Sequence, residues 1–181
     1  YNDFLEIIEK REQNYPLQYI FGKWEFYGLE LFVDESALIP RFETEILVDE
    51  ILKLDCKKDK ILDIGCGYGV VSVILKSFYP EASVTLSDVN ERALELSEEN
   101  LKKYNINDYH IIKSDAFEKI TEKFDVILSN PPIRAGKDII FKIYSEAYEH
   151  LNKDGEFYCV IQTKHGAKST KKKLMEIFKN C

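Results

Sequence analysis

Five short apolar runs alternate with helical segments from residue 60 onward, and this alternation limits the fold more than any other feature. The runs cover residues 61–64, 83–86, 110–112, 124–128 and 157–161, with helical spacing of apolar residues near 70–78, 91–104, 138–151 and 168–179. Such strands are typical of parallel strands buried on both faces. Right-handed crossovers then predict a doubly wound α/β sheet, whose ligand lies at the carboxyl ends of the strands where their order reverses.

The first 60 residues follow a different pattern. Residues 2–12 resemble the end of a helix, which Tyr15-Pro16 stops. The aromatic and β-branched stretch 19–33, interrupted at Tyr27-Gly28, predicts a β-hairpin, and residues 43–54 are again helical. We therefore expect residues 1–42 to form a helix end and a hairpin, and residues 43–181 to form the domain that contains the sheet.

Length and composition exclude several classes of protein. The chain has 181 residues, 45% of them hydrophobic and 31% charged, which fits one globular domain with at most a small appendage. No apolar run approaches the roughly 18 residues needed to span a bilayer, and no signal-peptide pattern is present, so we expect a cytoplasmic protein without a membrane partner. The four cysteines and three histidines are scattered, which favours reduced thiols and no metal site.

Charge is unevenly distributed along the chain. The net charge of −7 argues against a protein that coats nucleic acid. Residues 1–133 carry 15 Lys and Arg against 26 Asp and Glu, whereas residues 134–181 carry 10 against 6. The densest basic group is either a small basic face or a solvated helix face; it consists of Lys164, Lys168, Lys171, Lys172 and Lys173.

A glycine-rich turn follows the first predicted strand of the sheet. The segment 63–69 reads Asp-Ile-Gly-Cys-Gly-Tyr-Gly, and a predicted helix comes next. Glycines allow a sharp turn and a close approach of a ligand, and the helix N-terminus offers free N–H groups. The spacing G-x-G-x-G disfavours NAD without excluding it, because dinucleotide enzymes use G-x-G-x-x-G. A tight turn without a ligand is the structural alternative.

Carboxylates follow the next two strands. Asp88 ends the second strand, 19 residues after Gly69, where it can accept hydrogen bonds from the two ribose hydroxyls of an adenosine. Asp115 and Ala116 follow the third strand, where Asp115 can accept a hydrogen bond from the adenine amino group and Phe117 can lie near the adenine ring. The structural alternatives are a solvated strand-end aspartate at 88 and a helix N-cap at 115.

The fourth strand ends in Ser129-Asn130-Pro131-Pro132-Ile133. Consecutive prolines fix the backbone and leave carbonyls without competing N–H donors. The Asn130 side-chain oxygen and the Pro131 carbonyl can together accept two hydrogens from a planar NH₂ group. Such a nitrogen is a poor nucleophile because its lone pair is delocalised, so holding both hydrogens and aiming the lone pair helps it react.

With these motifs the sequence resembles class I S-adenosylmethionine-dependent methyltransferases, in the group with an N-P-P-x motif that acts on conjugated amino nitrogens. The resemblance implies S-adenosylmethionine as cofactor and Asn130 and Pro131 as catalytic residues. It implies the cofactor-binding residues Gly65, Cys66, Gly67, Tyr68, Gly69, Asp88, Asp115, Ala116 and Asn130. The implied substrate-binding residues are Asn130, Pro131, Pro132 and Ile133.

Two families within that group are visible in different parts of the chain. Residues 11–50 resemble the release-factor glutamine methyltransferases, in Tyr15–Ile20, Gly22, Phe26–Gly28 and Leu38–Glu45. Residues 60–181 are more similar to the small-subunit ribosomal-RNA guanine-N2 methyltransferases, in Asp63–Val70, Asp88–Leu94, Asn130–Lys137, Val160–Lys164 and Gly166–Ser169. Glutamine methyltransferases normally have Tyr where this chain has Ile133. The resemblance also implies that residues 1–42 cover the substrate side. The family fold has two further strands after the fifth; we count five strands here, so we expect those two to be missing and the fifth strand to be an exposed edge.

The leading hypothesis is methyl transfer to a planar amino nitrogen, with a release-factor glutamine as acceptor and the release factor as partner. Guanine in small-subunit ribosomal RNA is the alternative acceptor. A non-catalytic S-adenosylmethionine-binding or scaffold domain is the alternative from another class, and an NAD-dependent dehydrogenase is remote.

Overall fold

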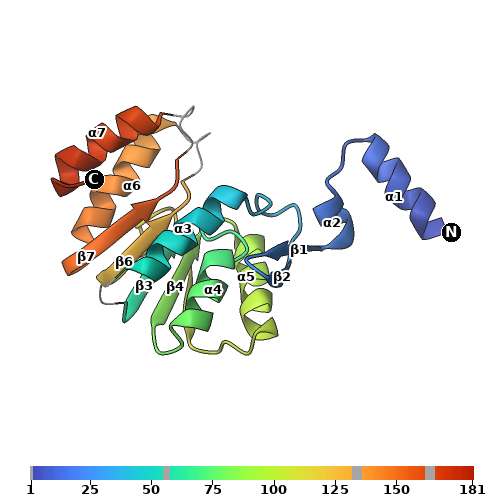
Figure 1. Ribbon diagram of the computed structural model, residues 1–181, viewed down its shortest axis with the longest axis horizontal. Helices are drawn as coiled ribbons and strands as arrows, with labels where there is room; N and C mark the ends of the chain where they lie inside the picture. Colours follow the sequence, from blue (N-terminus) through green and yellow to red (C-terminus); the bar gives the residue numbers. More distant parts are fainter. Residues whose placement is uncertain (1, 55–57, 132–135, 162–165) are drawn as a thin grey trace.

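The computed structural model describes residues 2–54, 58–131, 136–161 and 166–181. Its centre is a five-stranded parallel sheet in the order β5-β4-β3-β6-β7 (Figure 1). The strands are β3 (Lys60–Ile64), β4 (Ser83–Asp88), β5 (Tyr109–Lys113), β6 (Phe124–Ser129) and β7 (Leu151–Cys159). The order reverses between β3 and β6, so the predicted doubly wound sheet is confirmed. Ile64 pairs with Ser87 of β4 and with Ser129 of β6, which brings the three strand ends together.

Helices cover both faces of this sheet (Figure 1). One core joins α3 (Phe42–Lys53), α4 (Val70–Phe78) and α5 (Glu91–Lys103) to one face of the strands, and the other joins α6 (Lys137–Glu149) and α7 (Ala167–Phe178) to the opposite face. Neighbouring strand residues alternate between the two cores, with Ile61 in the first and Leu62 in the second. Both are fully buried, which explains why the strands are apolar throughout.

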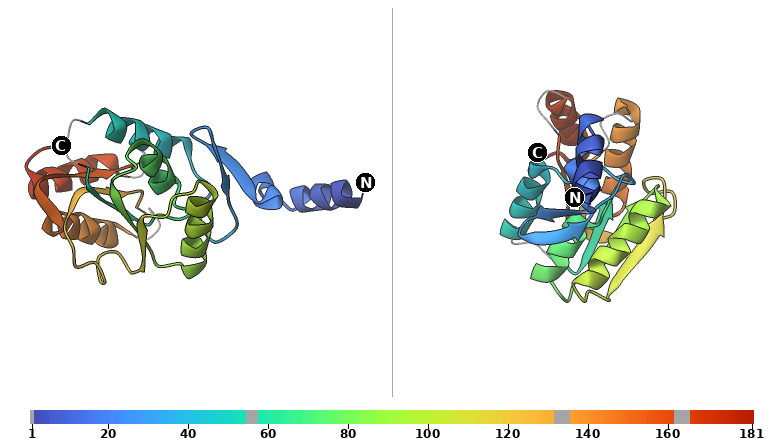
Figure 2. Two further views of the ribbon diagram at one scale, coloured as in Figure 1. Left: turned by 90° about the horizontal axis from the view of Figure 1, so that it is seen from below. Right: turned by 90° about the vertical axis from the view of Figure 1, so that its right-hand side faces the viewer.

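The N-terminal segment extends away from the sheet (Figure 2). It contains α1 (Asn2–Glu12), α2 (Leu17–Phe21) and an antiparallel hairpin of β1 (Lys23–Phe26) and β2 (Leu29–Phe32). The predicted hairpin is confirmed, although its first strand begins later than expected. The short helix α2 occupies residues whose aromatic and β-branched composition favoured a strand, and Gly22 ends it in a left-handed conformation with φ +66°.

The bounds predicted around β7 were wrong. The strand begins at Leu151, directly after α6, where a helix was expected, and it ends at Cys159 rather than at residue 161. Its register shifts, since Leu151 pairs with Phe124 whereas Glu156 pairs with Val126. The polar residues inserted by this irregularity interrupt the apolar pattern, so the pattern starts only at residue 157.

In the described part of the chain β7 pairs only with β6, which makes it the edge strand that the sequence predicted. None of the helices within the described ranges is long and apolar enough to cross a membrane.

Candidate active site at the carboxyl ends of the strands

The glycine turn after β3 adopts a backbone that ordinary residues rarely take. Gly65, Gly67 and Gly69 have φ of +71°, +55° and +70°. A Cβ at Gly69 would lie 3.0 Å from side-chain atoms of Leu86 and Ser97, so the turn packs too closely there for any side chain. A Cβ at Gly65 would meet nothing within 4 Å. The turn is therefore closed toward the core at Gly69 and open at Gly65, where a ligand can approach.

Asp88 ends β4 beside this turn, as predicted. Its Oδ2 accepts a hydrogen bond from the backbone N–H of Gly67 at 3.0 Å, and its Oδ1 accepts one from the backbone N–H of Asn90 at 2.9 Å. The carboxylate is only half-buried. Each oxygen of an ionised carboxylate has acceptor capacity for a second partner, so Asp88 can bind two neighbouring hydroxyl groups without losing its own anchors.

The side chains of Cys66 and Tyr68 lie in the protein interior. Cys66 Sγ lies 3.9 Å from Ser97 Oγ, and burial together with the charges of Asp63 and Asp88 raises the pKa of its thiol. Tyr68 is 1% exposed and its hydroxyl donates to the backbone carbonyls of Asp34 and Ala37. The sequence left the exposure of Tyr68 open; its side chain and that of Cys66 both pack inside the protein, and the Cys66 N–H donates to the Ser87 carbonyl at 3.1 Å.

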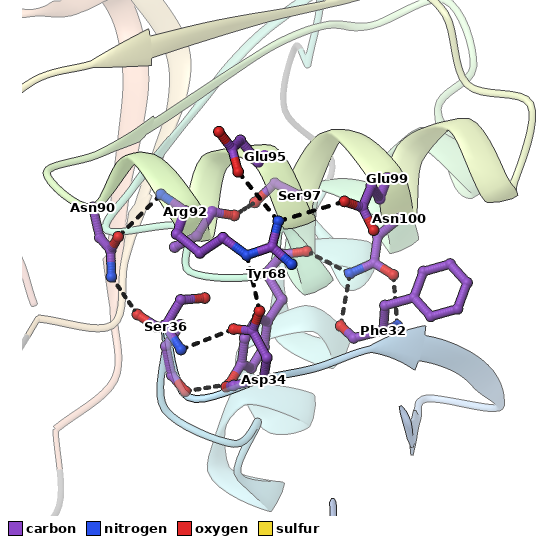
Figure 3. A network of polar contacts seen from close by, with 12 residues as sticks. Phe32, Asp34, Ser36, Tyr68, Asn90, Arg92, Glu95, Ser97, Glu99 and Asn100 are labelled. Atoms are coloured by element: carbon purple, nitrogen blue, oxygen red, sulfur yellow. Dashed lines mark hydrogen bonds and ion pairs between the residues drawn. The ribbon is translucent and has the colours of Figure 1, made fainter. Parts of the chain in front are cut away.

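Polar side chains on α5 tie the glycine turn to the segment that follows the hairpin (Figure 3). Ser97 Oγ donates to the Gly67 carbonyl at 2.6 Å. The Asn100 amide exchanges two hydrogen bonds with the backbone of Phe32, at 2.7 and 3.0 Å, and donates to the Tyr68 carbonyl at 3.1 Å. Asn100 is fully buried. The amide thus presents to β2 the donor and acceptor that a neighbouring strand would offer.

Two further residues of this region continue the same network. Asn90 Nδ2 donates to the Ser36 carbonyl at 2.5 Å, and Arg92 Nε donates to Asp34 Oδ2 at 3.1 Å (Figure 3). This network was not predicted from the sequence. The sequence feature that points to it is the pair Ser97 and Asn100, two polar residues on an otherwise apolar helix face, because a buried polar side chain needs a hydrogen-bond partner.

Asp63 lies one residue before the end of β3 and is also buried. Its Oδ2 accepts a hydrogen bond from Ser72 Oγ of α4 at 2.9 Å. Burial raises the pKa of Asp63 to about 7, with a smaller contribution from the charge of Asp88, against the lowering effect of the Ser72 hydrogen bond. The sequence analysis gave this residue no role of its own.

The end of β5 brings Asp115 and Ala116 to the same edge of the sheet. Asp115 is exposed and Ala116 has a positive φ of +45°, which marks a sharp turn. Phe117, expected near the adenine ring, is buried and packs on His150 with ring centroids 4.7 Å apart. Asp115 and Ala116 therefore remain candidates for binding a ligand. The ring of Phe117 instead packs in the protein interior.

Asn130 follows β6 and lies beside the end of β3. Ser129 anchors the strand end, because its Oγ donates to the Ile64 carbonyl at 3.1 Å and its own carbonyl accepts from the Val160 N–H at 3.3 Å. Asn130 is exposed, and its Nδ2 donates to Thr44 Oγ1 at 3.3 Å. Pro131 is buried. Pro132 and Ile133 lie outside the described residues, as does Lys164.

The family model of the methyltransferase small domain matches residues 42–181. The chain belongs to the methyltransferase small domain family. This confirms the family resemblance, and S-adenosylmethionine is the cofactor of such a methyltransferase. The site fits it by chemistry: a Cβ at Gly65 would meet nothing within 4 Å, which leaves room for a ligand, and Asp88 keeps free acceptor capacity. The N–H groups of Gly65, Cys66, Gly67 and Gly69 already donate within the protein.

Curated relatives and solved structures agree with this assignment. The chain is 41% identical over 153 residues to the uncharacterized protein YbxB of Bacillus subtilis, covering 81% of this chain and 76% of that one. It is 42% identical over 134 residues to the release factor glutamine methyltransferase of Streptococcus pneumoniae, covering 74% of this chain and about half (48%) of that enzyme.

Among solved structures, the 16S rRNA N2 G1207 methyltransferase RsmC of Thermus thermophilus, in complex with AdoMet and guanosine, matches with a TM-score of 0.67 at 21% identity. The match covers 87% of this chain and 45% of RsmC, and at this identity it shows the fold alone.

Proposed function

We propose that this methyltransferase acts on a planar amide or amino nitrogen, and that its acceptor is the side-chain amide of a glutamine in a peptide-chain release factor. The main observation behind this proposal is the position of Asn130. It follows β6, which pairs with β3, the strand that leads into the glycine turn. The specific N-terminal segment 11–50 and the names of several relatives support the glutamine acceptor.

Each group of residues has a distinct task in this proposal. Gly65, Gly67 and Gly69 hold the methionine and ribose part of the cofactor through the backbone, together with the backbone of Cys66 and Tyr68, and Asp88 binds the ribose hydroxyls. Asp115 and Ala116 flank the adenine. When bound, S-adenosylmethionine supplies an electrophilic methyl group on a positively charged sulfur.

The acceptor side works by positioning. The Asn130 Oδ1 and the Pro131 carbonyl accept the two hydrogens of the acceptor NH₂, so that the nitrogen lone pair points at the methyl carbon. The N–C bond forms as the S–C bond breaks, and the nitrogen gives up its extra proton to water afterwards. No strong base is needed, because that proton becomes acidic only after the attack. Pro132 and Ile133 are the further substrate-binding residues of this proposal.

The N-terminal part acts in this proposal as a cover over the substrate side, with residues 1–42 as the cover and 43–181 as the S-adenosylmethionine-binding domain. The hydrogen bonds from Asn90, Arg92 and Tyr68 attach residues 34–37, at the end of the proposed cover, to α5 and the glycine turn, so this end lies at the edge of the sheet that carries the site. A Cβ at Gly67 would lie 3.4 Å from Ala37 Cβ, so the two segments are in close contact.

The second candidate acceptor is guanine N2 in small-subunit ribosomal RNA. The similarity of residues 60–181 to that family favours it, together with the lysines of α7 at positions 168, 171, 172 and 173.

The deciding experiment offers methyl-labelled S-adenosylmethionine with either purified release factor or isolated small ribosomal subunits. We expect label in the release factor, and none with the Asn130→Ala variant. Label in RNA alone would overturn the glutamine assignment in favour of guanine. Binding of S-adenosylhomocysteine in calorimetry without transfer to either acceptor would overturn the catalytic proposal and leave a binding module.

A further inference from the structure

The side chain of Asn130 is in contact with α3, an element that the proposed reaction does not otherwise use. Asn130 Nδ2 donates to Thr44 Oγ1 at 3.3 Å, across 86 positions of sequence. Asn130 is exposed at the strand end, whereas Thr44 is only 4% exposed in the first turn of α3. A buried hydroxyl therefore holds one end of an exposed amide.

The orientation of this amide matters for methyl transfer. The terminal torsion of an asparagine has two broad wells, related by a rotation that exchanges the carbonyl oxygen with the NH₂ group. Only the oxygen can accept a hydrogen from the acceptor nitrogen; the rotated amide would place two donors against each other. With Nδ2 engaged by Thr44, Oδ1 points away from α3 and stays free to accept.

Thr44 is well suited to serve as a fixed reference point. Its backbone N–H donates to the Arg41 carbonyl at 2.9 Å, within the first helical turn. Leu47, Val48 and Ile51 of the same helix are buried in the core. Threonine has two common χ1 rotamers in a helix, and the burial of Thr44 restricts the choice, so the hydroxyl keeps a defined position relative to the helix.

We propose that Thr44 is a positioning residue, which sets the amide of Asn130 so that its oxygen faces the acceptor nitrogen. Thr44 itself touches neither cofactor nor acceptor in this role. The proposal rests on the proposed methyl transfer at Asn130, and it extends the site to the first turn of α3.

Kinetics of matched variants test the catalytic consequence. Thr44→Val keeps the shape and removes the hydroxyl, so kcat with whichever acceptor takes the label should fall about 10-fold, because much of the amide population then lies in unproductive orientations. The affinity for S-adenosylhomocysteine should not change. Thr44→Ser should recover most of the activity. Thr85→Val is the control, since it removes a comparably buried hydroxyl (5% exposed) in β4; it should leave kcat unchanged.

A spectroscopic measurement tests the contact without any turnover. The side-chain NH₂ signal of Asn130, identified by its loss in Asn130→Ala, should shift in Thr44→Val, return in Thr44→Ser and stay in place in Thr85→Val. An unchanged signal or an unchanged kcat in Thr44→Val overturns the positioning role. That failure is distinct from failure of the proposed function, which would appear as undiminished methyl transfer by Asn130→Ala.

Discussion

The cofactor side of the site, at the ends of β3 and β4, and the acceptor side, at the end of β6, differ in how firmly their side chains are held. On the cofactor side, Asp88 accepts two backbone hydrogen bonds, and Ser97 and Asn100 bind the carbonyls of the glycine turn. On the acceptor side, the exposed amide of Asn130 is joined to Thr44 by a hydrogen bond of 3.3 Å. Among the described residues, several hydrogen bonds therefore hold the cofactor side, and one holds the Asn130 amide.

This difference suggests a division of labour. Preorganised donors and acceptors give affinity, because little has to be ordered when the ligand binds. A lightly held amide contributes by orientation, so its loss should reduce the rate more than the binding. Changes on the cofactor side should therefore affect binding and stability, and changes on the acceptor side should affect kcat.

Replacement of Asn130 by Ala is the strongest test of the acceptor side. We expect kcat for methyl transfer to fall on the order of 10³-fold, or about 4 kcal/mol, since a positioned polar group at the reacting atom is lost. The dissociation constant of S-adenosylhomocysteine, measured by calorimetry, should change less than about 3-fold. A large loss of cofactor affinity would show that the two sides are not separable.

Titration of Asp63 tests how tightly the cofactor side is packed. Burial raises its pKa from 3.8 to about 7, so the native state holds a proton that the unfolded chain has already released between these values. Stability is then fully present below pH 3.8 and is lost as the pH rises toward 7, by roughly 3 to 4 kcal/mol. Asp63→Asn does not titrate. Urea unfolding of both proteins between pH 4 and 7 should give diverging free energies, and parallel profiles would contradict a buried, protonated Asp63.

Removal of the Asn100 amide tests the network on α5. Asn100→Ala leaves the Phe32 N–H and the carbonyls of Phe32 and Tyr68 without their buried partner, and we expect a loss of about 3 kcal/mol in the free energy of unfolding. Asn107→Ala is a suitable control, because Asn107 is exposed and donates only a local hydrogen bond to Asn105. Equal effects of the two changes would mean that the network does not stabilise the turn.

Loss of the Asp88 carboxylate should have the opposite effect to the Asn130 variant: cofactor affinity should fall, and kcat at saturating cofactor should change little. Asp88→Ala removes the group proposed to bind the ribose hydroxyls and the anchor of the Gly67 N–H, so affinity for S-adenosylhomocysteine should fall about 100-fold. At saturating cofactor, kcat should recover to within about 3-fold of the wild-type value. A kcat that stays low at saturation would show that Asp88 also acts on the acceptor side.

Parts of this site could be predicted where a short stretch of sequence marks them. The positions of Asp88 and Asn130 at one edge of the sheet were predictable from the sequence, because each follows an apolar run and parallel strands bring such ends together. The glycine turn was found for the same reason. The contact between Thr44 and Asn130 has no such signal, since it joins positions 86 apart through the packing of α3 on the sheet.

Local composition also misled the prediction in two places. Residues 19–21 are aromatic and β-branched enough to favour a strand, yet they belong to α2, outside the hairpin, where no sheet partner is present in the described chain. The start of β7 was missed because residues 152–156 lack apolar side chains. The pairing with β6 shifts register on the two sides of Asp125, so no apolar alternation marks this part of the strand. Both errors concern pairing, which depends on neighbours distant in sequence.

The smallest expected effect comes from Arg92, at the exposed rim of the α5 network. Its guanidinium contacts Asp34 and Glu95 at 3.1 Å, but the side chain of Arg92 is 52% exposed, so water and salt screen these pairs. Arg92→Ala should cost less stability than any of the changes above, and the cost should shrink in high salt. Urea unfolding at two salt concentrations measures it. A loss of stability similar to that of Asn100→Ala would mean that the exposed ion pairs of Arg92, and not the buried Asn100 amide, hold residues 34–37 against the glycine turn. The contrast between the two sides of the site would then depend on surface charge.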